Sequence, residues 1–324
     1  MCINTAYKAD LAVDLLIVDE AHKTLSPEFR KVYTNIKHDK LCLLTATLPE
    51  SGEYREFVDI ISPIVYSKKL KDARKHEGLV ADFRLYNLGV NLPKYGQHTY
   101  DAFSNMLDEA MIKLSQYRKK VKFLQSYSSV FDIAKAASKG LPYDETDVQL
   151  VEHYKDIVKY GKQFWFAMSK RRQTVQANDE KIIAASTIIA RHPNRQWLIF
   201  CSTKKYAERV AKALGGKVYH SGMSTEDRET VLEGFANQEF SKLVSVKALL
   251  EGIDIPEVDG ALALGFDSVE IDSTQSIGRI IRWKPFKDAI FVNVYSNNTQ
   301  EKEWARKRTL GLEPIWVTQV MQII

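Results

Sequence analysis

Residues 15–22 have the sequence Leu-Leu-Ile-Val-Asp-Glu-Ala-His, and this stretch decides the fold class of the chain. Its apolar run, Leu15 to Val18, is typical of a strand buried on both faces of a parallel sheet. In open α/β sheets, ligands bind beyond the carboxyl ends of the strands. The stretch therefore predicts a sheet edge at which Asp19 and Glu20 meet a ligand. One carboxylate can hold Mg²⁺, and the other can orient or deprotonate a water.

A second polar turn strengthens this interpretation. The apolar run 41–44 predicts a neighbouring strand, and Thr45-Ala46-Thr47 follows it directly. An Asp-Glu pair alone fits equally well a strand that leaves the core through a polar turn. With His22 after the pair and with the second turn beside it, the sequence favours a functional site.

The rest of the chain divides by its periodicity. Residues 1–66 and 196–295 alternate apolar runs with amphipathic stretches, which predicts parallel sheets with helical crossovers. The first part contains an expected helix that starts at Ser26-Pro27-Glu28, with Phe29, Val32, Tyr33 and Ile36 following at helical spacing. The second contains expected strands at 197–201, 217–219, 243–246, 261–264 and 289–294. Residues 99–190 have almost no strand signal and predict about four helices.

Composition limits the possible classes of protein. The chain has 324 residues, 46 Lys and Arg against 41 Asp and Glu, and 45% hydrophobic residues, which suits a folded protein of about two domains. No apolar run reaches the length of about 20 residues that spans a bilayer, and we expect no membrane partner. The three cysteines are far apart, which argues against a disulfide framework and fits a reducing cytosol.

Several motifs, taken in order, resemble those of superfamily 2 DEAH/DEAD-box helicases and DNA translocases. The strand 197–203 resembles the opening of the second motor lobe. The motifs are Asp19-Glu20-Ala21-His22, Thr45-Ala46-Thr47, Tyr219-His220-Ser221-Gly222, Glu251-Gly252-Ile253-Asp254-Ile255-Pro256 and Gln275-Ser276-Ile277-Gly278-Arg279-Ile280-Ile281-Arg282.

The resemblance implies an α/β fold with RecA-like lobes. The expected parts are a partial lobe one in 1–67, a linker with the first strand of lobe two in 68–98, a helical insertion in 99–190, a complete lobe two in 191–298 and a tail in 299–324. We expect the tail to pack on lobe two or on a partner.

The resemblance also implies roles for individual residues. Asp19 and Glu20 hold Mg²⁺, Glu20 positions the attacking water, and Arg282 is an arginine finger with Arg279 beside it. The other residues expected near ATP are His22, Gly252, Asp254 and Gln275. The residues expected to contact nucleic acid or couple it to ATP are Thr45, Thr47, Ser202, Gly222 and Ser245. Several of these roles have a plainer alternative. His22 can be a hydrogen-bonded structural residue, and Gly252 and Asp254 can form a simple turn. The two arginines can belong to a solvated helix face.

The phosphate-binding loop of such enzymes, Gly-x-x-x-x-Gly-Lys-Ser/Thr, is absent from the sequence. We therefore expect little ATP turnover by this chain alone, and we expect the loop to come from a separate polypeptide or from an upstream coding segment. The lobe-one sheet would then expose an apolar edge and face.

The expected function is ATP-dependent movement on nucleic acid, with DNA favoured over RNA because the motif spellings resemble repair and restriction-type motors. Two alternatives remain open: an ATPase-inactive remnant that binds nucleic acid, and the motor subunit of a restriction-type nuclease. Basic clusters at 118–120 and 170–172, with interspersed aromatic residues, suit nucleic-acid contacts by the helical block. An ordinary helical subdomain explains them equally well. We expect the protein in the cytoplasm, with the nucleoid, or in a host cytoplasm if the gene is viral.

Overall fold

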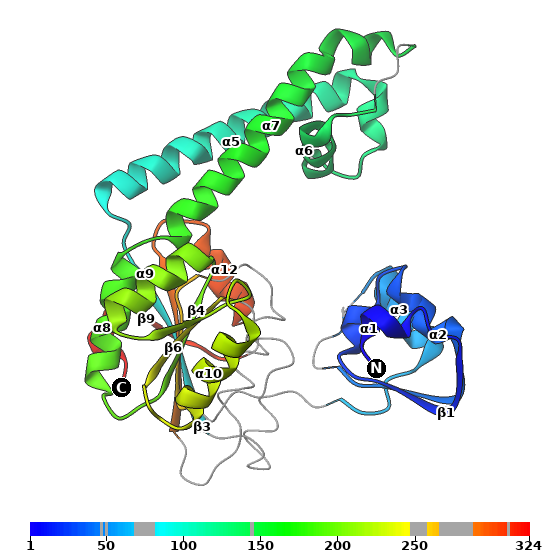
Figure 1. Ribbon diagram of the computed structural model, residues 1–324. Helices are drawn as coiled ribbons and strands as arrows, with labels where there is room; N and C mark the ends of the chain where they lie inside the picture. Colours follow the sequence, from blue (N-terminus) through cyan, green and yellow to red (C-terminus); the bar gives the residue numbers. More distant parts are fainter. Residues whose placement is uncertain are drawn as a thin grey trace. The chain divides into compact units, whose positions relative to one another are not determined.

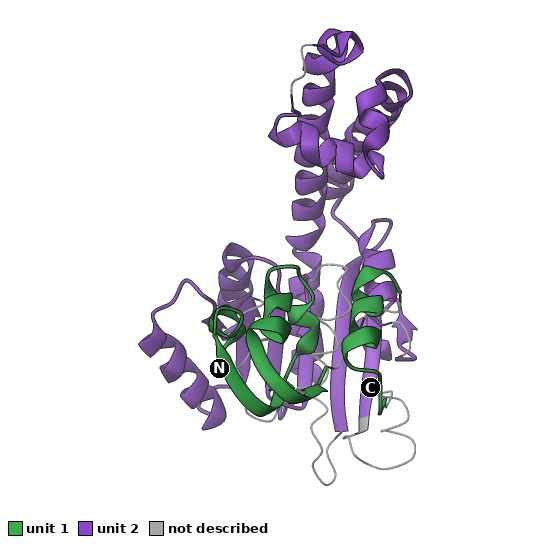
Figure 2. Ribbon diagram, turned by 90° about the vertical axis from the view of Figure 1, so that its right-hand side faces the viewer, with its two compact units in different colours: residues 1–77 green, residues 78–324 purple. Residues whose placement is uncertain are grey.

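The computed structural model divides the chain into two compact units, residues 1–77 and 78–324 (Figure 2). The residues that the structure describes are 1–45, 48, 51–67, 82–142, 146–246, 258–265, 288–309 and 312–324.

Unit 1 is a small α/β unit with a parallel strand pair. Strands β1 (Leu11–Val18) and β2 (Ile36–Leu43) pair in the register Leu16 to Leu41. Helices cover one face of this pair, and Leu16 packs there against Ala6, Val32 and Ile36. The helical segments are α1 (Ile3–Ala6), η1 (Ala21–Thr24), η2 (Phe29–Lys31), α2 (Val32–Asn35) and α3 (Glu53–Ile61).

Two expectations for unit 1 are wrong. The helix expected through Ile36 ends at Asn35, and Ile36 instead begins β2. Strand β1 is not buried on both faces, because no helix covers its second face within the described residues. On that face the alternate side chains Leu11, Val13, Leu15 and Ile17 are 39–57% exposed.

Unit 2 contains a seven-stranded sheet in the order β5-β6-β4-β7-β8-β3-β9, and every neighbouring pair is parallel. This confirms the predicted α/β class with a parallel sheet. The expected tail supplies the edge strand β9, which pairs with β3. The strands are β3 (Asp82–Val90), β4 (Trp197–Cys201), β5 (Lys217–Tyr219), β6 (Lys242–Val246), β7 (Gly260–Ala263), β8 (Asp288–Ser296) and β9 (Ile315–Val317).

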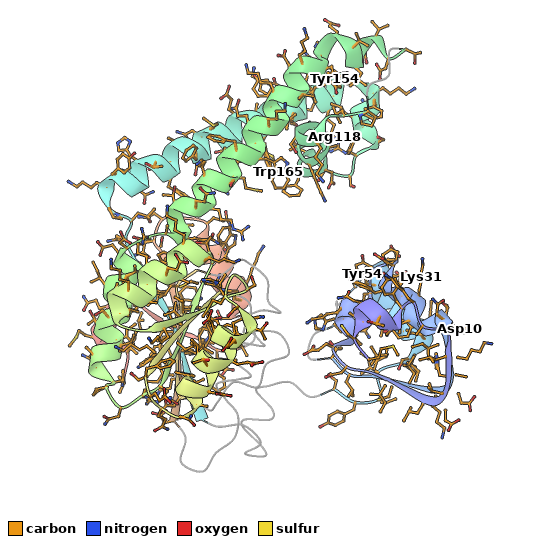
Figure 3. All side chains as sticks on the ribbon, in the orientation of Figure 1. Asp10, Lys31, Tyr54, Arg118, Tyr154 and Trp165 are labelled. Atoms are coloured by element: carbon orange, nitrogen blue, oxygen red, sulfur yellow. The ribbon has the colours of Figure 1, made fainter. Side chains whose placement is uncertain are left out.

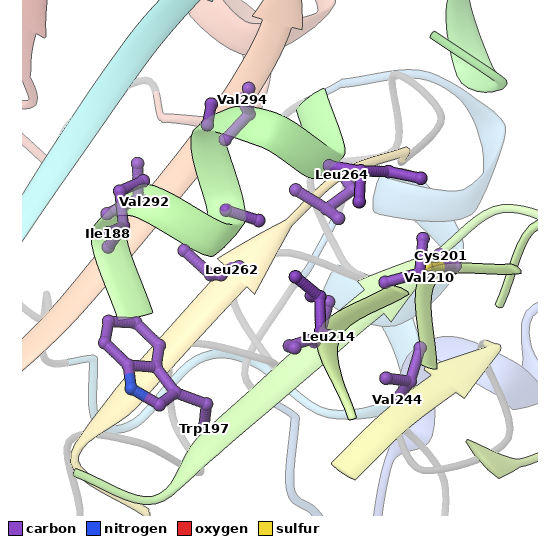
Figure 4. Close-up of a cluster of buried hydrophobic side chains, with 14 of the residues drawn as sticks. Ile188, Trp197, Cys201, Val210, Leu214, Val244, Leu262, Leu264, Val292 and Val294 are labelled. Carbon is purple, nitrogen blue, oxygen red and sulfur yellow. The ribbon is translucent and has the colours of Figure 1, made fainter. Parts of the chain in front are cut away.

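Helices pack on this sheet, and their ends follow local sequence signals. The Thr203 and Ser224 hydroxyls accept hydrogen bonds from Tyr206 N–H and Asp227 N–H at 3.2 and 3.0 Å, which caps the helices that follow. Gly215 ends the first of these at a φ of 65°, where glycine is favoured. The core between sheet and helices includes Ile188, Trp197, Val210 and Val292 (Figure 4). The helical segments are α8 (Glu180–Arg191), α9 (Lys204–Leu214), α10 (Thr225–Ala236), α12 (Glu301–Arg308) and η5 (Val320–Gln322).

The helical block has its own core and consists of α5 (Lys94–Lys120), η3 (Lys122–Ser126), α6 (Val130–Lys139) and α7 (Val148–Gln176). Helices α5 and α7 lie side by side (Figure 1). Gly161 permits close contact of α7 with α6, because a Cβ there would lie 2.5 Å from the Ala137 Cβ. The observed block is shorter at its end than the expected 99–190, since α8 packs on the sheet core instead. None of the helices in the described ranges is both long and apolar enough to cross a bilayer.

Aromatic side chains of the block are mostly structural. Tyr154 donates to the Leu141 carbonyl at 3.1 Å, and Tyr117 donates to Asp156 at 3.1 Å. Tyr154 and Trp165 lie along α7 and Arg118 on α5 (Figure 3). All three tyrosines at 117, 127 and 154 pack against the core of the block. An ordinary helical subdomain therefore explains these rings. Tyr143, which is another of the interspersed aromatic residues of the block, lies outside the described residues.

Candidate functional site

The two carboxylates of unit 1 lie directly after β1. Glu20 has a left-handed backbone, with φ 50° and ψ 44°, and its N–H donates to Asp19 Oδ1 at 2.9 Å. A non-glycine residue in this conformation costs free energy, and such residues cluster at functional sites. The turn thus presents both carboxylates beyond the carboxyl end of a parallel strand, as the sequence predicted.

His22 joins this turn to the one that follows β2. Its Nδ1 lies 3.0 Å from Thr45 Oγ1 and 3.3 Å from Glu20 Oε2. The main chains are also tied, because Ala21 N–H donates to the Leu44 carbonyl at 3.0 Å. Glu20 Oε2 is buried and makes no hydrogen bond within the described chain. The structure therefore brings Glu20, His22 and Thr45 together, while Thr47 lies outside the described residues.

Arg30 is a structural support that the sequence did not reveal. Its Nε donates to the Leu25 carbonyl at 2.7 Å, just after the carboxylate turn. Its guanidinium also pairs with Glu53 at 3.0 Å and lies 4.4 Å from the centroid of the Phe57 ring, both on α3. One side chain thus braces the turn against α3. No pattern in the sequence distinguished it from a surface arginine.

The carboxylate turn suits Mg²⁺ better than a metal that needs a complete protein cage. No group of three or more His, Cys, Asp and Glu side chains gathers as a metal site within the described ranges. Mg²⁺ is usually bound through one or two carboxylates together with waters and substrate phosphates. Asp19 is exposed, and Glu20 Oε2 accepts no hydrogen bond within the described residues, so both residues fit that role.

In unit 2, three expected residues meet at the carboxyl edge of the sheet. Ser202 follows β4, Ser245 lies in β6 beside Phe200 of β4, and Gly222 follows β5. The hydroxyl oxygens of Ser202 and Ser245 are buried and have no hydrogen-bond partner in the described part of the chain. Such groups cost free energy unless a partner reaches them. They fit an edge that receives a ligand or another segment.

Gly222 allows a lysine to approach this edge. A Cβ at position 222 would lie 3.0 Å from the Lys204 Nζ. The Gly222 N–H donates to His220 Nδ1 at 3.1 Å, which orders the turn. Lys204 was not predicted from the sequence, because a lysine in the first turn of a helix is usually a solvated surface residue.

A buried ion pair lies beneath the same edge. Lys181 and Glu301 are 0% and 2% exposed, and Lys181 Nζ lies 2.7 Å from the Glu301 carboxylate. Lys181 also donates to the Leu264 carbonyl at 3.0 Å, and Glu301 accepts from Ser296 N–H at 2.8 Å. Burial lowers the pKa of Lys181, and the Glu301 charge opposes that shift. Burial likewise lowers the pKa of Arg308, which lies beside this pair, to about 10.

The remaining expected site residues lie outside the described residues. They are Gly252, Asp254, Gln275, Arg279 and Arg282. Their roles near ATP and in coupling stay predictions. Segments 247–257 and 266–287, which contain them, follow β6 and β7 in the sequence.

Comparison with known proteins agrees with the α/β fold. Residues 180–284 match the model of the helicase conserved C-terminal domain. The chain is 24% identical over 297 residues to a DNA 3'-5' translocase XPB2 of Sulfurisphaera tokodaii, covering 91% of this chain and 61% of the relative. It is 37% identical over 105 residues to a DEAD-box ATP-dependent RNA helicase 21 of Oryza sativa subsp. japonica, covering 31% of this chain and 14% of that protein.

A solved structure is also similar. The Hef helicase domain of Pyrococcus furiosus matches with a TM-score of 0.51 and 18% identity, covering 90% of this chain and 72% of that one. The chain is therefore similar to the C-terminal part of superfamily 2 helicases and translocases, and it spans 61% of the length of the Sulfurisphaera tokodaii relative.

Proposed function

We propose that the protein is an ATP-dependent helicase or translocase that acts on DNA. The observation that carries this proposal is the ordered turn after β1, in which Glu20, His22 and Thr45 lie together beyond the carboxyl end of a parallel strand. The match to a helicase C-terminal domain supports the same function. DNA is favoured because the DNA translocase aligns with 91% of the chain and the RNA helicase with 31%.

The chemistry assigned to the turn is phosphoryl transfer to water. Asp19 would hold Mg²⁺, which neutralises phosphate charge when bound. Glu20 would orient the attacking water with its carboxylate, while His22 keeps the Glu20 turn in contact with Thr45. Arg279 and Arg282 would approach the phosphates from the second lobe, with Gln275, Gly252 and Asp254 nearby. We also propose that the protein acts in the cytoplasm or at the nucleoid.

We also propose that a segment other than these 324 residues supplies the phosphate-binding loop, because the sequence contains no Gly-x-x-x-x-Gly-Lys-Ser/Thr. Its backbone amides and lysine normally hold the β- and γ-phosphates. A polypeptide with that loop is therefore the expected protein partner.

An ATPase assay tests this proposal. The chain alone, with Mg²⁺ and DNA, should hydrolyse ATP at a rate near background. Adding a polypeptide that is encoded beside it and carries the loop should produce DNA-stimulated turnover, and Glu20→Gln should abolish turnover while ATP stays bound. Robust turnover by the chain alone would show that no further loop is needed.

The second candidate is a nucleic-acid-binding protein without ATPase activity, and the missing loop favours it. It predicts DNA binding that neither ATP nor Glu20→Gln changes, even with the loop-bearing polypeptide present. A restriction-type motor subunit would share the ATPase result of the first proposal and would need a nuclease subunit for cleavage.

A further inference from the structure

A polar depression lies at the carboxyl ends of β3 and β8, where α5 and α12 begin. Its volume is about 460 Å³, within the range of ligand-binding pockets. The residues that line the depression belong to none of the motifs recognised in the sequence. These lining residues are Asn91, Tyr100, Asn297, Asn298, Thr299, Gln300, Lys302 and Glu303.

The strands and side chains around it form an ordered wall. Asn297 N–H donates to the Val90 carbonyl at 2.7 Å, which continues the pairing of β8 with β3. The Asn297 amide donates to Asn91 Oδ1 at 2.9 Å, and the Gln300 N–H donates to the Tyr100 hydroxyl at 2.8 Å. The depression therefore has a defined shape built from two turns and a helix.

Other polar groups of the wall are available to a ligand. The structure gives Asn298 and Gln300 no side-chain hydrogen bond in the part of the chain that it describes, and Lys302 is exposed. Carboxamides both donate and accept hydrogen bonds, as the edges of nucleobases do. An ammonium group is suited to a phosphate. The Arg171 guanidinium lies 5.7 Å from the centroid of the Tyr100 ring and adds positive charge nearby.

The depression lies on the same sheet edge as Ser202. All neighbouring strands are parallel, so β4 and β3 end at one edge, with β7 and β8 between them. Three strand spacings amount to about 14 Å, which is close to the rise of about four stacked nucleotides. A strand of nucleic acid along this edge can therefore contact both places.

We propose that this depression binds one nucleotide of the nucleic-acid strand that lies along the carboxyl edge of the sheet. Lys302 contacts a phosphate, and Asn298 and Gln300 contact the base or sugar. The depression is open and polar, so a single small ligand buries too little surface there for tight binding. A nucleotide within a longer strand can bind there despite this small buried surface. The contacts that the rest of the strand makes with the protein raise the effective concentration of that nucleotide at the depression. The inference rests on the proposed function, since it assumes that the edge binds nucleic acid.

Fluorescence anisotropy with a labelled single-stranded oligodeoxynucleotide, measured over a series of salt concentrations, tests the inference on the full chain. Lys302→Gln should weaken binding roughly threefold to tenfold and reduce the salt slope by about 0.7, the value for one lost phosphate contact. Asn298→Gly removes the carboxamide and suits the φ of 54° at this position. It should weaken binding with the salt slope unchanged.

Lys307→Gln is the matched control, because Lys307 is an exposed lysine on the same helix that does not line the depression. Equal binding by all three variants and the unchanged chain would overturn the inference. If the unchanged chain binds no nucleic acid, the proposed function itself fails. Free dAMP should compete poorly at equal nucleotide concentration, and equal competition would assign the depression to a free nucleotide, contrary to the proposal.

Discussion

Lys181 shows how a single residue can support the carboxyl edge of the sheet in unit 2. Its ammonium group has no solvent exposure and bonds the end of β7 and the start of α12 through Leu264 and Glu301. Replacing a buried ion pair by apolar groups is often tolerated, whereas removing one partner leaves an uncompensated charge. The pair therefore acts as a unit, and its geometry holds together the ends of β7 and β8.

Lys181→Met should lower the free energy of unfolding by about 3–5 kcal/mol, because the Glu301 carboxylate is left buried and unpaired. The double variant Lys181→Met with Glu301→Gln should cost less than the two single changes together. Urea unfolding followed by tryptophan fluorescence measures both. Lys205→Met, on the exposed side of α9, is the control and should change the value by less than about 0.5 kcal/mol. A Lys181 effect as small as that of Lys205 would contradict this account.

At the scale of elements, the sequence predicted the parts of the fold in which local signals and packing agree. Strands 197–201 and 217–219 were found at those bounds because each apolar run is short and the helices beside it carry their own caps. The helix expected over 29–36 is present as η2 and α2 over 29–35, and only its last residue is wrong: Asn35 is a weak helix former, and β-branched Ile36 pairs with β1 as the start of β2. The buried lysine and the depression were not predicted, since both depend on residues far apart in the sequence.

The charge of the helical block gathers on one face of α7. Residues 94–176 contain 14 Lys and Arg against nine Asp and Glu. Lys155, Lys159, Lys162, Phe166 and Lys170 recur at helical spacing, and all five are exposed. The clusters expected from the sequence are partly structural, because Arg118 donates to the Tyr127 carbonyl at 2.7 Å and Arg171 lies over Tyr100.

Neutralising Lys155, Lys159 and Lys162 together to Gln should reduce the salt slope of oligonucleotide binding by up to about 2, because each lost phosphate contact removes about 0.7. Anisotropy over a series of salt concentrations measures this slope. A triple Gln variant at the exposed lysines 205, 212 and 217 keeps the same net charge and serves as the control. If both triple variants give the same salt slope, overall charge alone explains the change in binding, and this face of α7 does not contact the oligonucleotide.

Within the described residues, the two units differ in how completely their sheets are covered. The core of unit 2 includes fully buried strands on its parallel sheet. Unit 1 leaves Leu11, Val13, Leu15 and Ile17 exposed on one face of a two-stranded pair. Parallel strands are normally covered on both faces, and a pair of strands alone is only marginally stable. The bare face agrees with the apolar surface expected from the sequence.

This face should cause the isolated chain to self-associate, because contiguous exposed apolar surface promotes association in water. Leu15→Ser with Ile17→Ser should shift the chain towards monomer and lower its binding of a hydrophobic dye, with unfolding changed by less than about 1 kcal/mol. Analytical ultracentrifugation at several protein concentrations measures the association. Leu16→Ser on the same strand is the matched control: Leu16 packs against Val32 and Ile36, so this change should destabilise unit 1 without relieving association. If the double variant and the unchanged chain associate equally, a different surface mediates self-association.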